Sequence, residues 1–221
     1  ALVRRLRELL GGALDDALRV HRFLESGGFT TGGLVADSSD PRGTEAVQSF
    51  IPVLRSGGLK RLFLERPVLA RLTAVIVTQW IDATKEFLER LDADIVGPVA
   101  ALASVQRVPR RVERVEAGLS DPHRGGRTVF KESFDTGITL AYKPKSLAAD
   151  CAFHRLLAWL SERGAPASAG TVRTIDCGSY GWAVWATPTP CQTQDEVDTF
   201  FRRSGAFLCL LRVLRSTDLH Y

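Results

Sequence analysis

The chain has 221 residues, enough for one large domain or two small ones, and an ordinary globular composition with 45% hydrophobic and 24% charged residues. Its net charge of +4 fits phosphate-bearing or acidic peptide partners, but it lacks the dense basic run that is typical of a nucleic-acid-binding protein. Four widely spaced cysteines argue against a zinc site and favour reduced thiols. We find no signal peptide, and the longest apolar run is too short to span a bilayer. We therefore expect a cytoplasmic globular protein without a membrane span or a nucleic-acid partner.

The first half of the chain shows helical periodicity. The spacing of apolar residues predicts a helix over residues 1–26, a second over 44–54, a long third from Pro67 to about Leu91, and a short fourth within 94–104. The polar stretch 29–43 predicts a loop. Nothing in these helices indicates catalysis.

The periodicity changes at Val105. Arginine and valine alternate over residues 108–115, which is typical of a strand. We therefore divide the chain into a helical domain over residues 1–104 and an α+β domain over residues 105–221.

The stretch Leu119–Lys145 organises the second half. It predicts a strand, a glycine-bearing turn, a strand, a tight turn at 135–137 and a strand that ends before Pro144. Ile138, Leu140 and Tyr142 share one face of that last strand, whereas Thr139, Ala141 and Lys143 share the other. A small residue two positions before a lysine leaves room for a flat base and places a cation for phosphates. The same Ala-x-Lys arrangement occurs in the kinase strand that follows a glycine-rich hairpin.

The rest of the chain continues as helix, two strands and a long helix. We expect a helix over 147–163, strands over 171–176 and 180–186, and a long helix that starts with the capping box Thr193–Glu196. Trp182 and Trp185 fall on opposite strand faces, so one belongs to the core and the other could line a cleft. The chain then reaches Asp218 and His220.

This order matches the parts of a kinase active site. An aspartate after a long helix can accept the proton of a substrate hydroxyl, as Asp218 would here. Backbone N–H groups at Gly125 and Gly126 could cradle phosphate oxygens. Asp121 should repel a triphosphate, so it would orient His123, hold a metal or do chemistry of its own. The alternative is that these residues have no functional role: Asp121 and Asp218 would be turn residues, and Lys143 would be a solvated lysine at a strand end.

Several motifs together also resemble a known family. The resemblance to the dehydratase domain of class II lanthipeptide (lantibiotic) synthetases, the LanM type, covers most of the chain. The motifs are Leu119–His123 with Gly125 and Gly126, Tyr142–Leu147, Asp218–His220, and, in the helical part, Arg66–Leu72 and Glu86–Leu91.

The resemblance implies a helical region followed by a kinase-like, more closely lipid-kinase-like, N-lobe with an antiparallel sheet and the start of the C-lobe. It implies ATP-dependent phosphorylation, with Mg²⁺, of Ser and Thr in a ribosomal precursor peptide (leader plus core). Elimination of the phosphate would then give dehydroalanine or dehydrobutyrine. By motif position, the catalytic residues would be Asp121, His123, Lys143, Asp218 and His220, and the nucleotide-binding residues would be Lys143, Gly125, Gly126 and Ala141.

The chain also departs from the family pattern. It stops at Tyr221, before the acid, the asparagine and the later metal-binding aspartate of the family's catalytic loop, so we assign it no metal ligand. We expect an incomplete amino-terminal piece that is inactive alone. Asp150 and Glu162 are both candidates for an acid that pairs with Lys143.

Three other functions stay open at this point. The chain could be a kinase-like phosphotransferase without elimination, a non-catalytic precursor-peptide-binding module that uses the helical half, or a helical scaffold.

Overall fold

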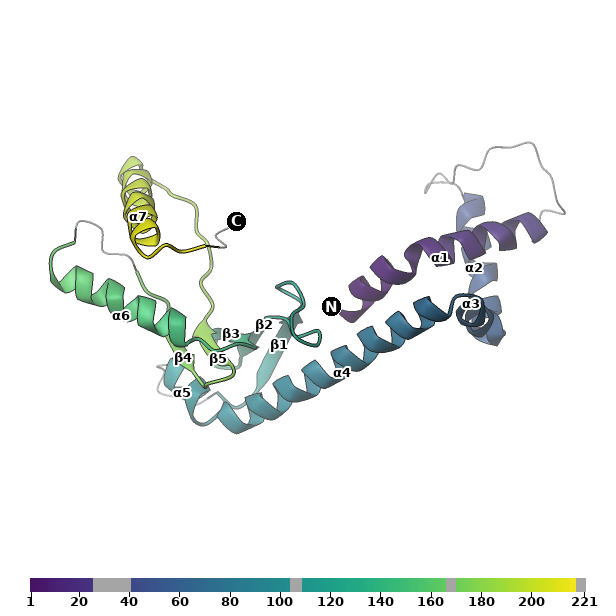
Figure 1. Ribbon diagram of the computed structural model, residues 1–221, viewed down its shortest axis with the longest axis horizontal. Helices are drawn as coiled ribbons and strands as arrows, with labels where there is room; N and C mark the ends of the chain where they lie inside the picture. Colours follow the sequence, from purple (N-terminus) through teal and green to yellow (C-terminus); the bar gives the residue numbers. More distant parts are fainter. Residues whose placement is uncertain (26–40, 104–108, 166–169, 218–221) are drawn as a thin grey trace. The chain divides into compact units, whose positions relative to one another are not determined.

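The structure, a computed structural model, describes residues 1–25, 41–103, 109–165 and 170–217 (Figure 1). By its internal contacts the chain divides into two compact units. The first comprises Ala1–Lys85 with Arg124–Gly126, and the second comprises Glu86–His123 with Arg127–Tyr221. The domain boundary expected between residues 104 and 105 falls within residues 104–108, which lie outside the described residues. It stays a prediction.

The first unit is built from helices (Figure 1). These are α1 (Leu2–Glu25), α2 (Pro41–Val53), the π-helical turn η1 (Leu54–Gly58), α3 (Leu59–Glu65) and the first part of α4 (Pro67–Asp94). Helix α1 continues through the glycine pair expected to weaken it. Helix α2 starts three residues earlier than expected, because Pro41 suits a first helical position.

Helix α3 has no counterpart in the predicted elements. Gly57 adopts a φ of 119° and interrupts the helical path between α2 and α3. A Cβ on Gly58 would lie 2.7 Å from the carbonyl oxygen of Val53, so the chain bends there only because this position lacks a side chain.

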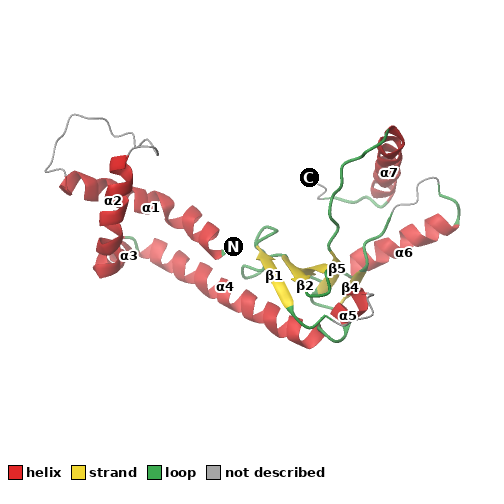
Figure 2. Cartoon of the chain, turned by 180° about the vertical axis from the view of Figure 1, so that it is seen from behind, coloured by secondary structure: helices red, strands yellow, loops and turns green. Residues whose placement is uncertain are grey.

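The second unit is an α+β structure, as the sequence predicts. Its sheet has five strands, is antiparallel throughout and has the order β1-β2-β3-β5-β4. Figure 2 shows the strands of this sheet in yellow. The strands are β1 (Val112–Ala117), β2 (Phe130–Phe134), β3 (Thr139–Lys143), β4 (Thr174–Asp176) and β5 (Gly181–Val184). Helices α5 (Pro98–Ala103), α6 (Ala148–Glu162) and α7 (Gln194–Val213) complete the unit with the end of α4. The capping box predicted at Thr193 and Glu196 is present at the start of α7.

An aromatic core covers one face of this sheet. Phe87 of α4 stacks on Phe130 of β2, with ring centroids 4.4 Å apart, and Tyr142 and Trp182 complete the cluster. The indole N–H of Trp182 donates to the carboxylate of Asp94 at 2.7 Å, so the one buried polar atom of that ring is satisfied. The predicted faces of β3 are confirmed, because Leu140 and Tyr142 belong to this core.

Candidate functional site

The opposite face of the sheet carries the residues that the sequence singles out. Strand register pairs Lys131 of β2 with Ala141 of β3, and Ala141 with Ala183 of β5, so these three residues form one row across the sheet. Lys143 pairs with Gly181 at one end of this face. At the other end, the backbone N–H of Trp185 donates to the carbonyl of Thr139 at 2.9 Å. We call this surface the polar face.

Lys143 forms an ion pair with Asp150 on the polar face. Its ammonium nitrogen lies 3.4 Å from a carboxylate oxygen of Asp150, and the two side chains are 32% and 30% exposed. Asp150 lies in the first turn of α6, where the helix dipole favours a negative charge. Of the two acids considered for this lysine, the structure therefore selects Asp150, because Glu162 is the last residue of the same helix.

The turn between β3 and α6 is fixed by Asp176 of β4. The carboxylate of Asp176 accepts a hydrogen bond from the backbone N–H of Leu147 at 2.6 Å and one from the hydroxyl of Ser146 at 3.1 Å. Gly181 is needed beside this turn, since a Cβ there would lie 2.7 Å from the side chain of Leu147. The first turn of α6, and with it Asp150, is thus held against the sheet.

The loop between β1 and β2 holds the remaining predicted residues. It leaves the sheet after Ala117 and returns at Phe130, which pairs with Tyr142, so it lies at the same end of the sheet as Lys143. Asp121 and His123 are exposed in this loop, and within the described chain their side chains make no hydrogen bond or ion pair. The backbone groups of His123 and Arg127 exchange two hydrogen bonds of 2.9 Å.

Three consecutive residues at the loop tip have positive φ. The values are 39° for Arg124, 85° for Gly125 and 82° for Gly126. Glycine takes this conformation at little cost, whereas for Arg124 it is a local strain of the kind that clusters at functional sites. Successive backbone N–H groups in turn conformations of this kind can form an anion-binding concavity. Positive φ accounts for the choice of glycine at these two positions, and their phosphate-binding role stays a prediction.

The base of the loop is clamped to α4, which sequence reasoning missed. The guanidinium of Arg127 donates to both carboxylate oxygens of Glu86: Nε lies 3.2 Å from Oε1 and 2.9 Å from Oε2, and Nη2 lies 2.5 Å from Oε2. Glu86 also pairs with Arg90, and Arg90 donates to the hydroxyl of Tyr142 at 2.6 Å. The i,i+4 spacing of Glu86 and Arg90 was the sole signal in the sequence, and it gives no indication of Arg127.

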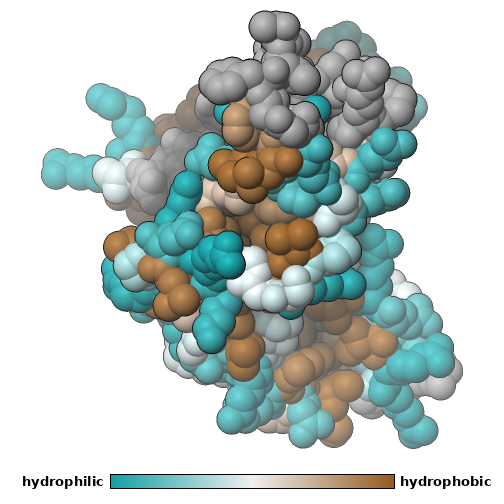
Figure 3. Space-filling model, turned by 90° about the vertical axis from the view of Figure 1, so that its right-hand side faces the viewer, coloured by the Kyte–Doolittle hydropathy of each residue, from teal (hydrophilic) through white to brown (hydrophobic). Residues whose placement is uncertain are grey.

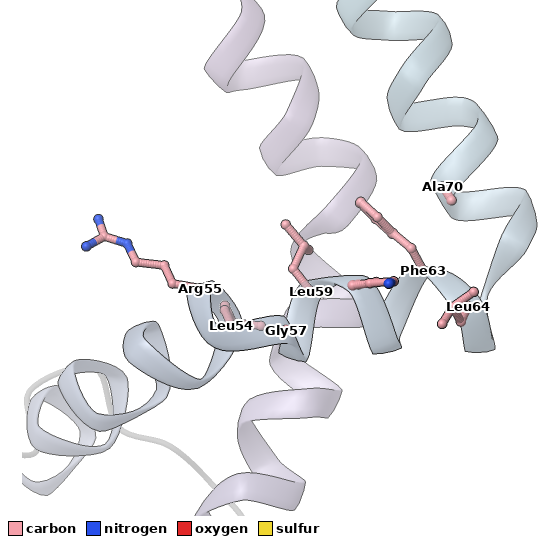
Figure 4. A pocket seen from close by; sticks show the side chains of 8 residues that line it. Leu54, Arg55, Gly57, Leu59, Phe63, Leu64 and Ala70 are labelled. Carbon is pink, nitrogen blue, oxygen red and sulfur yellow. The ribbon is translucent and has the colours of Figure 1, made fainter.

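The structure also describes an open groove of about 540 Å³ in the first unit (Figure 4). It is lined by Leu54, Arg55, Gly57, Leu59, Lys60, Phe63, Leu64 and Ala70. Arg55 points away from Leu59 and Phe63 in this view (Figure 4). The lining contains no acid and no histidine, so it does not share the chemistry of the polar face.

Two predicted catalytic residues, Asp218 and His220, lie outside the described residues. The structure therefore does not place them against Lys143. Across the described ranges, no group of three or more His, Cys, Asp or Glu side chains converges as a metal ligand set. None of the described helices is long and apolar enough to cross a membrane.

Comparison with known proteins shows the family to which the chain belongs. Residues 67–221 match the family described as "Domain of unknown function (DUF4135)". The chain belongs to this family. The DUF4135 domain is found in LanM-type lanthipeptide synthetases, so the resemblance drawn from the sequence motifs is confirmed.

A curated relative gives the family a biosynthetic setting. The chain is 30% identical over 90 residues to the "Lacticin 481/lactococcin biosynthesis protein LcnDR2" of Lactococcus lactis subsp. lactis. This match covers 37% of the present chain and 10% of that protein's length. The two comparisons together support a relationship to lantibiotic biosynthesis proteins, and they do not show the chemistry performed by this chain.

Proposed function

We propose that this chain supplies the nucleotide-binding part of a lanthipeptide dehydratase. The enzyme would phosphorylate Ser and Thr of a precursor peptide with ATP and then eliminate the phosphate. The observation that carries the proposal is the Lys143–Asp150 pair at 3.4 Å on the polar face of an antiparallel sheet. In protein kinases a strand lysine is likewise paired with an acid on the helix that follows it.

The ion pair between Lys143 and Asp150 would fix the position of the lysine side chain. A lysine on a strand end can adopt many rotamers, and the carboxylate of Asp150 limits them and holds the ammonium group over the polar face. The charge of Lys143 would then meet the phosphates at the end of the sheet from which the β1–β2 loop also leaves. Gly125 and Gly126 stay proposed phosphate-binding residues through their backbone N–H groups.

The described residues fit a triphosphate better than they fit a metal. When bound, ATP with magnesium supplies the phosphoryl group and screens its charge. Lys143 and backbone amides are suited to phosphate oxygens, whereas Asp121 is the one acid of the loop, and no group of three or more His, Cys, Asp or Glu side chains forms among the described residues. We therefore assign the phosphate contacts to Lys143 and the loop, and we leave the metal without a ligand from the described residues.

Asp121 and His123 stay proposed catalytic residues, as do Asp218 and His220. Asp218 would accept the hydroxyl proton in the phosphorylation step. Asp121 and His123 are exposed on the loop, where they could reach a peptide substrate. Elimination needs a base for the α-proton and cations at the leaving phosphate, and Lys143 could serve as one of these cations in both steps.

Mass spectrometry of the precursor peptide tests this proposal. In the complete enzyme that carries this chain, we expect Lys143→Ala to lower phosphorylation by about a hundredfold or more, because one preorganised charge at the reacting phosphate is lost. Lys145→Ala, which removes an exposed lysine two residues further on, is the matched control and should retain activity. Unchanged phosphopeptide formation by Lys143→Ala would contradict the assigned role.

The same experiment separates the alternative functions. Loss of water from the peptide supports dehydration, whereas a stable phosphate adduct supports a phosphotransferase without elimination. Peptide binding that needs neither ATP nor Lys143 would support a non-catalytic binding module.

A further inference from the structure

Trp185 lies at the far end of the polar face from Lys143. Its backbone pairs with Thr139, two residues from Ala141 and four from Lys143 along β3. Since side chains alternate along a strand, the indole of Trp185 shares the face of Ala183 and Ala141. The contact with Lys131 confirms this, because the ammonium of Lys131 lies 4.8 Å from the centre of the Trp185 ring.

The polar face therefore has two chemically different ends. Lys143 is at the end where the β1–β2 loop leaves the sheet, and Trp185 is at the opposite end. Four residues of strand separate these ends, or about 13 Å. This distance is comparable to the length of an extended nucleoside triphosphate. Phosphates at Lys143 would thus place the base near Trp185.

The middle of the face offers little open surface. Ala141 is 5% exposed and Ala183 is 4% exposed, whereas Trp185 is half-buried and presents part of its ring. The ammonium of Lys131 lies over this ring, 4.8 Å from its centre, so a planar base would take the place of that cation. Of these three residues, Trp185 therefore offers a planar ligand the most open surface, and Ala141 stays a predicted nucleotide-binding residue.

We propose that Trp185 is the residue on which the base of the nucleotide stacks, and that it gives the site a preference for purines. The inference rests on the proposed function, because it assumes a nucleotide with its phosphates at Lys143. Stacking of a base on an indole is stronger than the contact of a partly exposed lysine with the same ring. Lys131 can leave the ring without losing its charge partner, because Glu116 lies 3.5 Å from its ammonium group.

Purine preference follows from the nature of the contact. A purine covers more of the indole than a pyrimidine does, and stacking does not read the hydrogen-bonding edge of the base. ATP and GTP should therefore bind with similar affinity, and both should bind more tightly than CTP.

Equilibrium binding by calorimetry tests the inference without measuring activity. The complete enzyme that carries this chain is titrated with ATP, GTP, CTP and inorganic tripolyphosphate. We expect Trp185→Leu to weaken ATP and GTP binding by about 5- to 100-fold while tripolyphosphate binding is unchanged. Trp185→Phe retains an aromatic ring and should recover part of the loss.

Two control variants make the result specific. Trp159→Leu removes an exposed tryptophan of α6 that also receives a cation, from Arg163 at 4.0 Å, and it should bind every ligand as the parent does. Lys143→Ala should weaken tripolyphosphate and ATP alike, because it acts at the phosphate end.

The outcomes distinguish the inference from the function on which it rests. If the parent enzyme binds no nucleotide, both are overturned. If the parent binds ATP and Trp185→Leu binds it equally well, or loses ATP and tripolyphosphate to the same extent, the stacking role is wrong while the nucleotide site stands. A loss confined to the base-bearing ligands, with recovery in Trp185→Phe, supports the inference.

Discussion

Glu132 is an acid buried in the centre of the sheet. It lies on the core face of β2 between Phe130 and Phe134, with no exposed surface, and neither carboxylate oxygen has a hydrogen-bond partner among the described residues. Burial raises the pKa of Glu132 from an ordinary 4.5 to about 8, and the nearby backbone N–H groups of Tyr142 and of Glu132 itself oppose this rise only in part. The side chain is therefore protonated in the folded state near neutral pH.

This protonation should make stability depend on pH. Below pH 4.5 both the folded and the unfolded state carry the proton, so Glu132 does not make the free energy of unfolding depend on pH. Between 4.5 and about 8 the unfolded state releases the proton and the folded state keeps it, so the free energy of unfolding falls as pH rises. At pH 7 the loss amounts to about 3 kcal/mol.

Urea unfolding of Glu132→Gln at several pH values tests this expectation. The neutral amide cannot titrate, so the variant should lose the downward slope between about pH 5 and about pH 8 and should be more stable than the parent at the upper end. Glu113→Gln, at an exposed position of β1, should keep the parent's slope. Equal slopes in Glu132→Gln and the parent would show that Glu132 is ionised or hydrated in the folded state.

At the scale of elements, the clamp between α4 and the β1–β2 loop is the contact most open to test. Arg127 pairs by its backbone with His123 and by its side chain with Glu86, so α4 restrains the residue directly opposite a proposed catalytic group. Glu86 is 22% exposed and Arg127 is 38% exposed. Removing one partner leaves the other half-buried without its charge-assisted hydrogen bonds, at a cost of about 1–3 kcal/mol.

We expect Glu86→Gln to loosen the loop while the sheet stays folded. Amide hydrogen exchange over residues 118–129 should become faster, and exchange in β3 and β5 should change little. Asp92→Asn removes an exposed carboxylate from the same helix and serves as the control. Parent-like exchange of the loop in Glu86→Gln would mean that the backbone pair of His123 and Arg127 holds the loop by itself.

The elements themselves were largely predictable from local signals. Pro67, Pro144 and the capping box at Thr193 mark boundaries through backbone geometry, which acts over a few residues, and the structure places its elements accordingly. Alternation along β3 likewise separated the face of Tyr142 from that of Lys143. The break at Gly57 and the short α3 escaped prediction, because they depend on the close approach of Gly58 to Val53 rather than on periodicity.

The site was less predictable than the fold. The pairing of β3 with β5 instead of β4 is a long-range choice, and it alone brings Trp185 onto the face of Lys143. The sequence predicted either Asp150 or Glu162 as the partner of Lys143. In the structure Asp176 anchors the start of α6, and this places Asp150 beside the lysine. The alternation of Glu132 with Phe130 and Phe134 was a local signal that its side chain is buried. That its carboxylate has no hydrogen-bond partner among the described residues follows only from the packed sheet.

At the scale of the whole molecule, the two units differ in the core that stabilises them. Among the described residues, the buried apolar ones of the first unit are Ala13, Phe50, Leu62 and Ala83, whereas the second unit has a continuous cluster with five large aromatic side chains. Apolar side chains also remain exposed on the surface, as separate patches among hydrophilic ones (Figure 3). Since buried apolar area is the main favourable term in folding, the helical unit should be the less stable of the two.

This difference predicts that the two units open at different free energies. In native-state hydrogen exchange at increasing denaturant, the amides of α1–α3 should exchange before those of β2, β3 and β5.

Two core substitutions test whether the units open independently. Phe87 is 1% exposed and stacks on Phe130, so Phe87→Ala should lower the free energy of opening of the sheet by about 3–5 kcal/mol. Leu62 is 6% exposed in α3, and Leu62→Ala should lower the opening energy of the helical unit by about 2–5 kcal/mol. If the units are independent, each substitution acts on its own set of amides and the double variant shows the sum. A single transition in which both substitutions shift every amide equally would show that the units unfold as one.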